Sequence, residues 1–82
     1  MKNKITLAET LNSILPLLPS GSTVTIDIHD FTNGKSLRLA DNQDFSSFIL
    51  ADEYKGFQVT NVTMDNNYYK KYSLFISAVK EY

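Results

Sequence analysis

Apolar residues near the start of the chain recur at the spacing of an amphipathic helix. Residues three or four positions apart share one face of a helix, and this stripe consists of Leu7, Leu11, Ile14, Leu15 and Leu18. Just before it, residues 6–9 (TLAE) match the capping box, in which Thr and Glu side chains accept hydrogen bonds from each other's backbone N–H. Pro16 has no backbone N–H, and its ring clashes with the preceding turn. The pattern therefore predicts a helix that begins after Thr6 and ends or kinks near Leu15.

Residues 23–40 alternate between polar and apolar positions, which is typical of strands with one buried face. The residues of the first strand that would face a core are Val24, Ile26 and Ile28. Asn33 and Gly34 suit a tight type I′ turn, because both central residues of that turn need positive φ. We therefore expect a β-hairpin with a two-residue turn at this dipeptide.

Such a turn also sets which residues face each other across the hairpin. It places Ile28 opposite Leu39 and His29 opposite Arg38. Asp30 then falls opposite an apolar residue, and we expect that mismatched pair at the exposed end of the hairpin.

Residues 41–56 carry the features of a second, shorter helix. Asp41 and Asp44 suit its N-cap and first turn, where carboxylates satisfy backbone N–H groups and oppose the helix dipole. Its apolar face would consist of Phe45, Phe48 and Ile49, and Gly56 would follow its last turn. Residues 51–56 fit a loop equally well, so the end of this helix is left open.

The last third of the chain predicts two further strands. Residues 57–64 favour a strand, but its apolar residues change face halfway, and a bulge near Thr60 would reconcile the two halves. Turn-forming residues follow at 65–67. Residues 68–79 form the longest candidate strand, with apolar residues on both faces. That pattern indicates a strand that is central in its sheet or covered on both sides.

Together these elements predict a single small α+β domain over residues 1–82, in the order α-β-β-α-β-β. The simplest architecture is a four-stranded antiparallel sheet with two helices packed on one face.

Charge and composition exclude several classes of protein. The net charge of −1 lacks the basic surface of a duplex DNA binder and the strong negative charge of a DNA mimic. The absence of cysteine excludes a disulfide scaffold and fits a reducing compartment. No apolar run approaches the roughly 20 residues that span a bilayer, and polar residues interrupt the apolar stretch that a signal peptide would need. We therefore expect a cytoplasmic protein without a membrane partner.

Few residues could carry catalysis. His29 is the only histidine, with Asp27 two residues away and Arg38 on the facing strand. A carboxylate beside an imidazole can transfer protons, but no second catalytic group accompanies them, and the ligand count is too low for a metal. Helix capping explains the carboxylates Asp41, Asp44, Asp52 and Glu53 better than a calcium loop does. No base is expected next to Ser36, Ser46 or Ser47. We expect a non-enzymatic protein with no catalytic residue, no metal and no cofactor.

The most unusual surface segment interleaves aromatic and basic side chains: Tyr68, Tyr69, Lys70, Lys71 and Tyr72. Such a segment can bind a protein, because tyrosine is frequent at the centre of interfaces. It can also stack on single-stranded bases and contact phosphates. A third interpretation is a strand end whose lysines block edge pairing and whose tyrosines are half-buried. We take these five residues as the expected partner-binding site.

An 82-residue domain with five Tyr and five Phe cannot bury all of its aromatic side chains, so we expect some of them to contact a partner. The predicted function is therefore a small protein-binding domain, with single-stranded nucleic-acid binding as the alternative. Homodimer formation is compatible with the same features. In size and composition alone, the chain is similar to phage and mobile-element accessory proteins, including anti-CRISPR inhibitors. That resemblance implies a protein that inhibits or adapts a host protein, and it assigns no residue.

Overall fold

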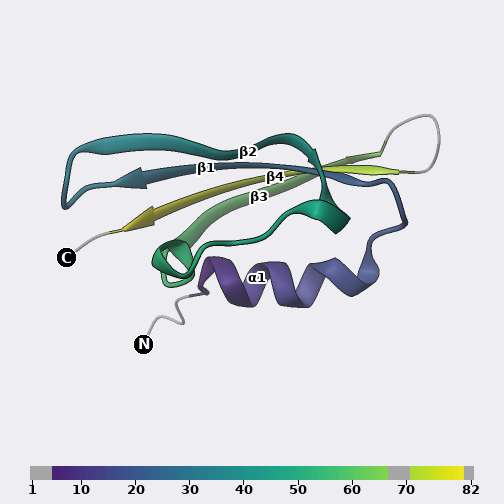
Figure 1. The fold of residues 1–82 in the computed structure, drawn as a ribbon, viewed down its shortest axis with the longest axis horizontal. Helices are drawn as coiled ribbons and strands as arrows, with labels where there is room; N and C mark the ends of the chain where they lie inside the picture. Colours follow the sequence, from purple (N-terminus) through teal and green to yellow (C-terminus); the bar gives the residue numbers. More distant parts are fainter. Residues whose placement is uncertain (1–4, 67–70, 81–82) are drawn as a thin grey trace.

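The computed structural model describes residues 5–66 and 71–80. Within them, four strands form one sheet, and one α-helix packs against one of its faces (Figure 1). The elements in chain order are α1 (Leu7–Ile14), the 3-10 turn η1 (Leu15–Leu17), β1 (Thr23–Asp30), β2 (Lys35–Asp44), the 3-10 turns η2 (Phe45–Ser47) and η3 (Asp52–Tyr54), β3 (Gln58–Asn66) and β4 (Tyr72–Lys80). The predicted α+β class is confirmed, whereas only the first of the two predicted helices forms.

Helix α1 begins and ends where the sequence predicts. The Thr6 hydroxyl accepts a hydrogen bond from the Glu9 N–H (3.2 Å), and the Glu9 carboxylate accepts one from the Thr6 N–H (3.1 Å). This completes the capping box, and the bond from the Thr6 backbone is the main reason that the pKa of Glu9 lies below its ordinary value. Regular helix stops before Pro16, which lies in the 3-10 turn η1.

The strand order is β2-β1-β4-β3, so the two inner strands are β1 and β4. β1 pairs antiparallel with β2, and β3 pairs antiparallel with β4, but β1 and β4 run parallel to each other. The sheet is therefore mixed, and the predicted all-antiparallel sheet is wrong. Side-chain alternation determines which face of a strand is buried, but it does not determine which strands become neighbours or how they run relative to each other.

The predicted helix within residues 41–56 is also wrong. Strand β2 continues to Asp44, and residues 45–57 then cross the helix-covered face as an extended segment with two 3-10 turns (Figure 1). Because β2 and β3 run in the same direction at opposite edges, this segment must return along the length of the sheet. The 10 residues of β2 span about 33 Å at 3.3 Å per residue. Residues 45–57 as a helix would reach only about 20 Å, so an extended path is required.

The β1–β2 hairpin is confirmed, but its predicted register is wrong by two residues. Ile28 lies opposite Leu37, and His29 lies opposite Ser36. Arg38, expected opposite His29, lies opposite Asp27 instead.

The shift arises because the turn is longer than the predicted two-residue turn. The Asp30 carboxylate accepts hydrogen bonds from the Thr32 N–H (2.9 Å) and the Asn33 side-chain amide (2.8 Å), and these bonds stabilise a turn over residues 31–34. Hydrogen bonds from Thr32 and then Asn33 lower the pKa of Asp30 to about 2. Gly34 has positive φ (65°), but Asn33 does not, so the turn is not the expected type I′.

Both of the last two predicted strands form, but with other bounds: β3 continues to Asn66, so the predicted turn is wrong at residues 65 and 66, and β4 begins at Tyr72. The register of β3 shifts between Val59 and Asn61, which places the bulge at Thr60. Strand β4 lies in the interior of the sheet, as its apolar residues on both faces indicate.

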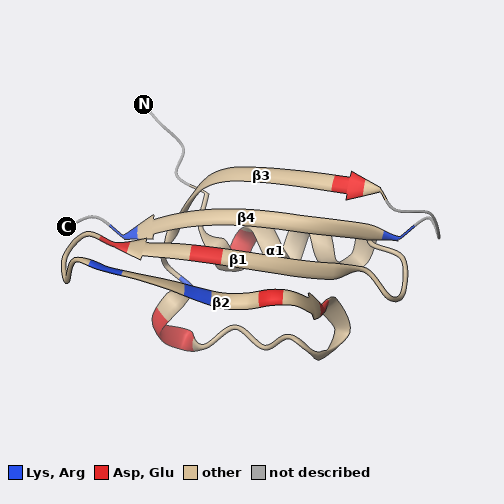
Figure 2. Cartoon of the chain, turned by 90° about the horizontal axis from the view of Figure 1, so that it is seen from above, with Lys and Arg blue, Asp and Glu red and all other residues tan. Residues whose placement is uncertain are grey.

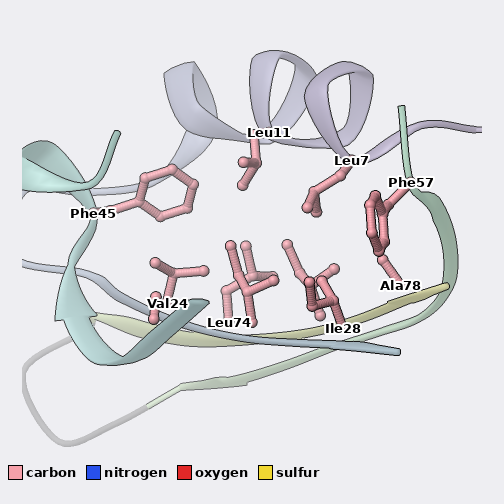
Figure 3. Packing of buried hydrophobic residues seen from close by; sticks show 11 residues of the cluster. Leu7, Leu11, Val24, Ile28, Phe45, Phe57, Leu74 and Ala78 are labelled. Atoms are coloured by element: carbon pink, nitrogen blue, oxygen red, sulfur yellow. The ribbon is translucent and has the colours of Figure 1, made fainter. Parts of the chain in front are cut away.

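The hydrophobic core fills the space between α1 and the sheet (Figure 3). Side chains from α1 meet alternate residues of the inner strands, and Phe45 and Phe57 pack at the two ends of the crossing segment. Its members are Leu7, Leu11, Val24, Ile26, Ile28, Ala40, Phe45, Phe57, Leu74, Ile76 and Ala78. Thus the whole core lies on one side of the sheet.

Candidate functional site

The face of the sheet opposite α1 is covered by no element among residues 5–66 and 71–80, and we call it the open face. Figure 2 is a view onto it, with the four strands in front and α1 behind them. The strand register assigns to it the residues that alternate with the core: Thr25, Asp27, His29, Ser36, Arg38, Asn61, Thr63, Asp65, Ser73, Phe75, Ser77 and Val79. The sheet therefore separates a buried face from an accessible one.

Phe75 is the large apolar residue at the centre of the open face. It belongs to the inner strand β4, and its neighbours on either side are Thr25 of β1 and Thr63 of β3. Phe75 is 41% exposed, whereas Leu74 beside it in the chain is fully buried in the core. Thr25 is buried, and its hydroxyl accepts a hydrogen bond from the Asn42 N–H (2.9 Å) in β2. A half-exposed aromatic ring thus lies on a rigid support.

An ion-pair network occupies the β2 side of the open face. Arg38 donates to both carboxylate oxygens of Asp27 (2.7 and 3.2 Å) and to Asp41 (3.4 Å). Hydrogen bonds from Arg38 to Asp27, followed by the charge of that carboxylate, raise the pKa of Arg38. The side chains of Arg38 and Asp27 are about half exposed (52% and 50%), so water screens the pair and it adds little to stability.

The candidate catalytic residues form hydrogen bonds that differ from the expected ones. His29 Nδ1 is hydrogen-bonded to the Ser36 hydroxyl, and its ring packs against Phe31 with 4.2 Å between ring centroids. The prediction that no base lies next to Ser36 is therefore wrong, because the two-residue register shift places Ser36 rather than Arg38 opposite His29. Arg38 holds both oxygens of Asp27, so this carboxylate does not orient the imidazole in the way that a catalytic triad requires.

Of the other carboxylates predicted to cap a helix, Asp44 caps the 3-10 turn η2, whereas Asp52 lies within η3 and forms an ion pair. Asp44 accepts a hydrogen bond from the Ser46 N–H (3.0 Å), and the bonds from Ser46 lower the pKa of Asp44. Asp52 forms an ion pair with Lys55 (2.6 Å), which likewise lowers the pKa of Asp52. Within the described part of the chain, no three His, Cys, Asp or Glu side chains come together in a way that could hold a metal ion.

The expected site at residues 68–72 is only partly described. Tyr68, Tyr69 and Lys70 lie outside the described residues. Tyr72 is half-buried at the start of β4, and its N–H donates to the Ser22 hydroxyl (3.1 Å). It has the same parity as Leu74, so its side chain belongs to the helix-covered side rather than the open face.

Lys71 lies at the corner where β1 begins and β2 ends. Its side chain lies against Gly21, where an added Cβ would come within 2.8 Å of the Lys71 Cε and Nζ atoms. Its charge contributes to the lowered pKa of Asp44. The two described members of the predicted site therefore pack at one end of the sheet, away from Phe75.

The charges on the open face leave it without a basic surface. By register and contacts it presents the carboxylates Asp27, Asp41 and Asp65, and the one described cation there is Arg38 (Figure 2). Arg38 forms ion pairs with two of these carboxylates, Asp27 and Asp41.

No helix in the described part of the chain is long and apolar enough to cross a membrane. Comparison with known proteins gave no relative, since no family model, no curated protein and no solved structure matches the chain.

Proposed function

We propose that this protein is a non-enzymatic binding domain and that it binds a partner protein through the open face, with Phe75 as the anchor. The observation that carries the proposal is the one-sided core: Leu74 is fully buried, while Phe75, next to it in the chain, is 41% exposed at the centre of the other face. Aromatic side chains on rigid supports are the typical anchors of protein interfaces.

The size of the open face supports a protein partner. Four strands about 4.8 Å apart and about nine residues long at 3.3 Å per residue cover roughly 500–600 Å² in projection. A standard interface buries about 800 Å² per partner. Side chains enlarge the contact area beyond the flat projection, so this face alone approaches the area that a stable complex needs.

Its charge argues against the nucleic-acid alternative. Affinity for single strands depends on cations that follow the phosphates and on several aromatic rings that stack on bases. The described open face has three carboxylates, and its arginine is already paired with two of them. Phosphates would be repelled here, whereas a protein with a basic or polar rim around an apolar pocket would fit.

The hydrogen bonds also favour binding over catalysis. His29 is hydrogen-bonded to Ser36, but Arg38 holds both oxygens of Asp27, so this carboxylate does not orient the imidazole for proton transfer from the serine. We propose the role of an inhibitor or adaptor of a host protein, in which a small domain with one binding face covers part of another protein.

The experiment compares capture of a partner by the wild-type protein and by variants on the two sides of the molecule. In a crosslinked pull-down from the native host, Phe75→Asp should lose the captured protein, because it places a charge at the centre of the interface. Leu17→Asp is the matched control, since Leu17 is 78% exposed in η1 on the helix side. Circular dichroism verifies that both variants fold.

A third variant tests the site expected from sequence. Tyr69→Ala combined with Tyr72→Ala should retain capture if the open face binds the partner. Capture that survives Phe75→Asp but is lost in the tyrosine double variant would reject the open face and favour residues 68–72. Loss of capture on treatment with nuclease would favour nucleic acid instead.

A further inference from the structure

The outer edge of β3 is only partly covered. The Val59 N–H donates to the Ile5 carbonyl (2.9 Å), and the Leu7 N–H donates to the Phe57 carbonyl (2.8 Å), so the segment before α1 covers the start of the strand. No other residue in the described ranges pairs with this edge beyond Val59. Within the described part of the chain, residues 60–66 therefore have no strand partner on this edge.

The backbone groups that point outward on this edge follow from Val59. In a strand of L-residues, the face that a side chain takes fixes the edge to which its own N–H and C=O point. Val59 lies opposite core residue Ala78 and directs its N–H outward. After the bulge, Val62 and Met64 take that face, opposite Ile76 and Leu74. Val62 and Met64 therefore direct their backbone donors and acceptors outward, where no described residue pairs with them.

The two edges of the sheet differ in their protection against further pairing. Edge strand β2 contains two register shifts, a positive φ at Asn42 (50°) and four charged residues. Bulges and charges of this kind prevent strands from adding to an edge. The open part of β3 has one charged residue, Asp65, and the side chains of Val62 and Met64 are 39% and 44% exposed. The β3 edge is therefore the one suited to pairing.

We propose that a second copy of this chain pairs with this edge, so that the two β3 strands run antiparallel about a two-fold axis at Thr63. This register uses the whole open edge and matches every cross-strand pair. Val62 of one copy faces Met64 of the other, and these two residues exchange both backbone hydrogen bonds. Asn61 faces Asp65, so an amide donates to a carboxylate and no like charges meet.

Other registers fit less well. An axis at Val62 would place Asp65 opposite Val59, whose N–H is already bonded to Ile5. An axis at Met64 would place Asn61 and Thr60 opposite residues 67 and 68, beyond the end of β3 at Asn66. The pairing about Thr63 also keeps the helix-covered faces of the two sheets on one side, since a residue on the core side of one β3 strand lies opposite a residue on the core side of the other. Both Phe75 rings would then lie on the same side of one joined sheet, although the dimer does not depend on the function proposed for them.

Sedimentation equilibrium over a range of concentrations tests the dimer. The wild-type chain should dimerise, and Val62→Lys should weaken the association at least tenfold. Leu37→Lys is the matched control: Leu37 is a half-exposed (49%) apolar residue on the same side of the sheet, but on the β2 edge. A wild-type chain that stays monomeric, or a dimer that responds to Leu37→Lys rather than Val62→Lys, overturns the proposal.

A mixing experiment tests the register. Val62→Lys and Met64→Glu should each be largely monomeric, but an equimolar mixture should form a heterodimer, because the introduced lysine of one chain then faces the introduced glutamate of the other. Circular dichroism verifies the fold of each variant. A mixture that stays monomeric while the wild type dimerises contradicts the pairing about Thr63.

A disulfide gives an independent readout, since the chain contains no cysteine. Residues at the two-fold axis form a pair without backbone hydrogen bonds, with Cα atoms about 4.5 Å apart, which lies within the range for a disulfide. Thr63→Cys should oxidise to a covalent dimer at low protein concentration, whereas Ser36→Cys on the β2 edge should remain monomeric. Equal crosslinking of the two variants would show only random collision and would contradict the proposed edge.

Discussion

Two neighbouring residues of β4 provide the sharpest test of the one-sided core. Leu74 is fully buried and Phe75 is 41% exposed, although they are adjacent in the chain. Truncating each to alanine removes apolar side chain from opposite faces of the same strand. Phe75 has the larger side chain, but its truncation should lower the free energy of unfolding less than the truncation of Leu74. The opposite order is expected when both residues lie in a core.

The magnitudes follow from burial. Leu→Ala at a closed core position costs about 2–5 kcal/mol, because it adds a cavity to the lost transfer free energy. Full burial of a Phe is worth about 1.5–3 kcal/mol, so a residue a little over half buried should lose about 1–2 kcal/mol. No closed cavity forms, because the open face lets water replace the ring. We expect Leu74→Ala to exceed Phe75→Ala by about 2 kcal/mol in the free energy of unfolding, which is the difference between the midpoints of these two ranges.

Urea unfolding followed by circular dichroism measures both values, and a thermal melt gives an independent comparison. In a domain of this size, a difference of about 1 kcal/mol moves Tm by about 4–8 °C. If Phe75→Ala destabilises the protein as much as Leu74→Ala or more, the ring of Phe75 is buried in solution. The face around it would then not be available to a partner, and the reasoning fails.

Two further predictions concern local hydrogen bonds. Thr6→Ala removes the capping-box hydroxyl of α1 and should lower the free energy of unfolding in urea by about 1 kcal/mol. Thr6→Ser keeps a hydroxyl and should lower it much less. Equal losses in both variants would argue against a cap. Asp30 has a pKa of about 2 in the folded chain against an ordinary value of 3.8. The unfolded chain therefore takes up a proton at Asp30 near pH 4, and the folded chain only near pH 2, so stability should fall as the pH drops through this window. Asp30→Asn should flatten that part of the profile, and an unchanged slope between pH 4 and 2 would contradict the turn geometry.

Local patterns in the sequence predict the features that depend on local physics. Residues 6–9 predict the start of α1, since the capping box needs only four consecutive residues. Alternation predicts which residues of β1 and β4 are buried, and the change of face in β3 predicts its bulge. Each of these features depends on contacts within one element or on a single buried face.

The features that sequence reasoning missed depend on distant contacts. The helix predicted within residues 41–56 has good local signals, but the length of the sheet requires an extended path there. The hairpin register depends on Asp30, whose carboxylate lengthens the turn beyond the two residues that Asn33 and Gly34 indicate. The parallel pairing of β1 with β4 has no local signal at all.

The candidate site shows the same division. Alternation along β4 places Phe75 on the face opposite Leu74, but it does not reveal that this face is open. The three-dimensional arrangement reveals it, because α1 and residues 45–57 both lie on the other side of the sheet (Figure 1). The composition of residues 68–72 predicts a partner-binding site, yet Lys71 and Tyr72 pack at the end of the sheet.

Photocrosslinking tests most directly whether a partner occupies the open face. A photoreactive phenylalanine analogue at position 75 should crosslink to the captured partner in high yield, and the same analogue at position 17, on the helix side, should not. Crosslinking from position 17 alone would place the partner on the wrong side of the molecule and contradict the account.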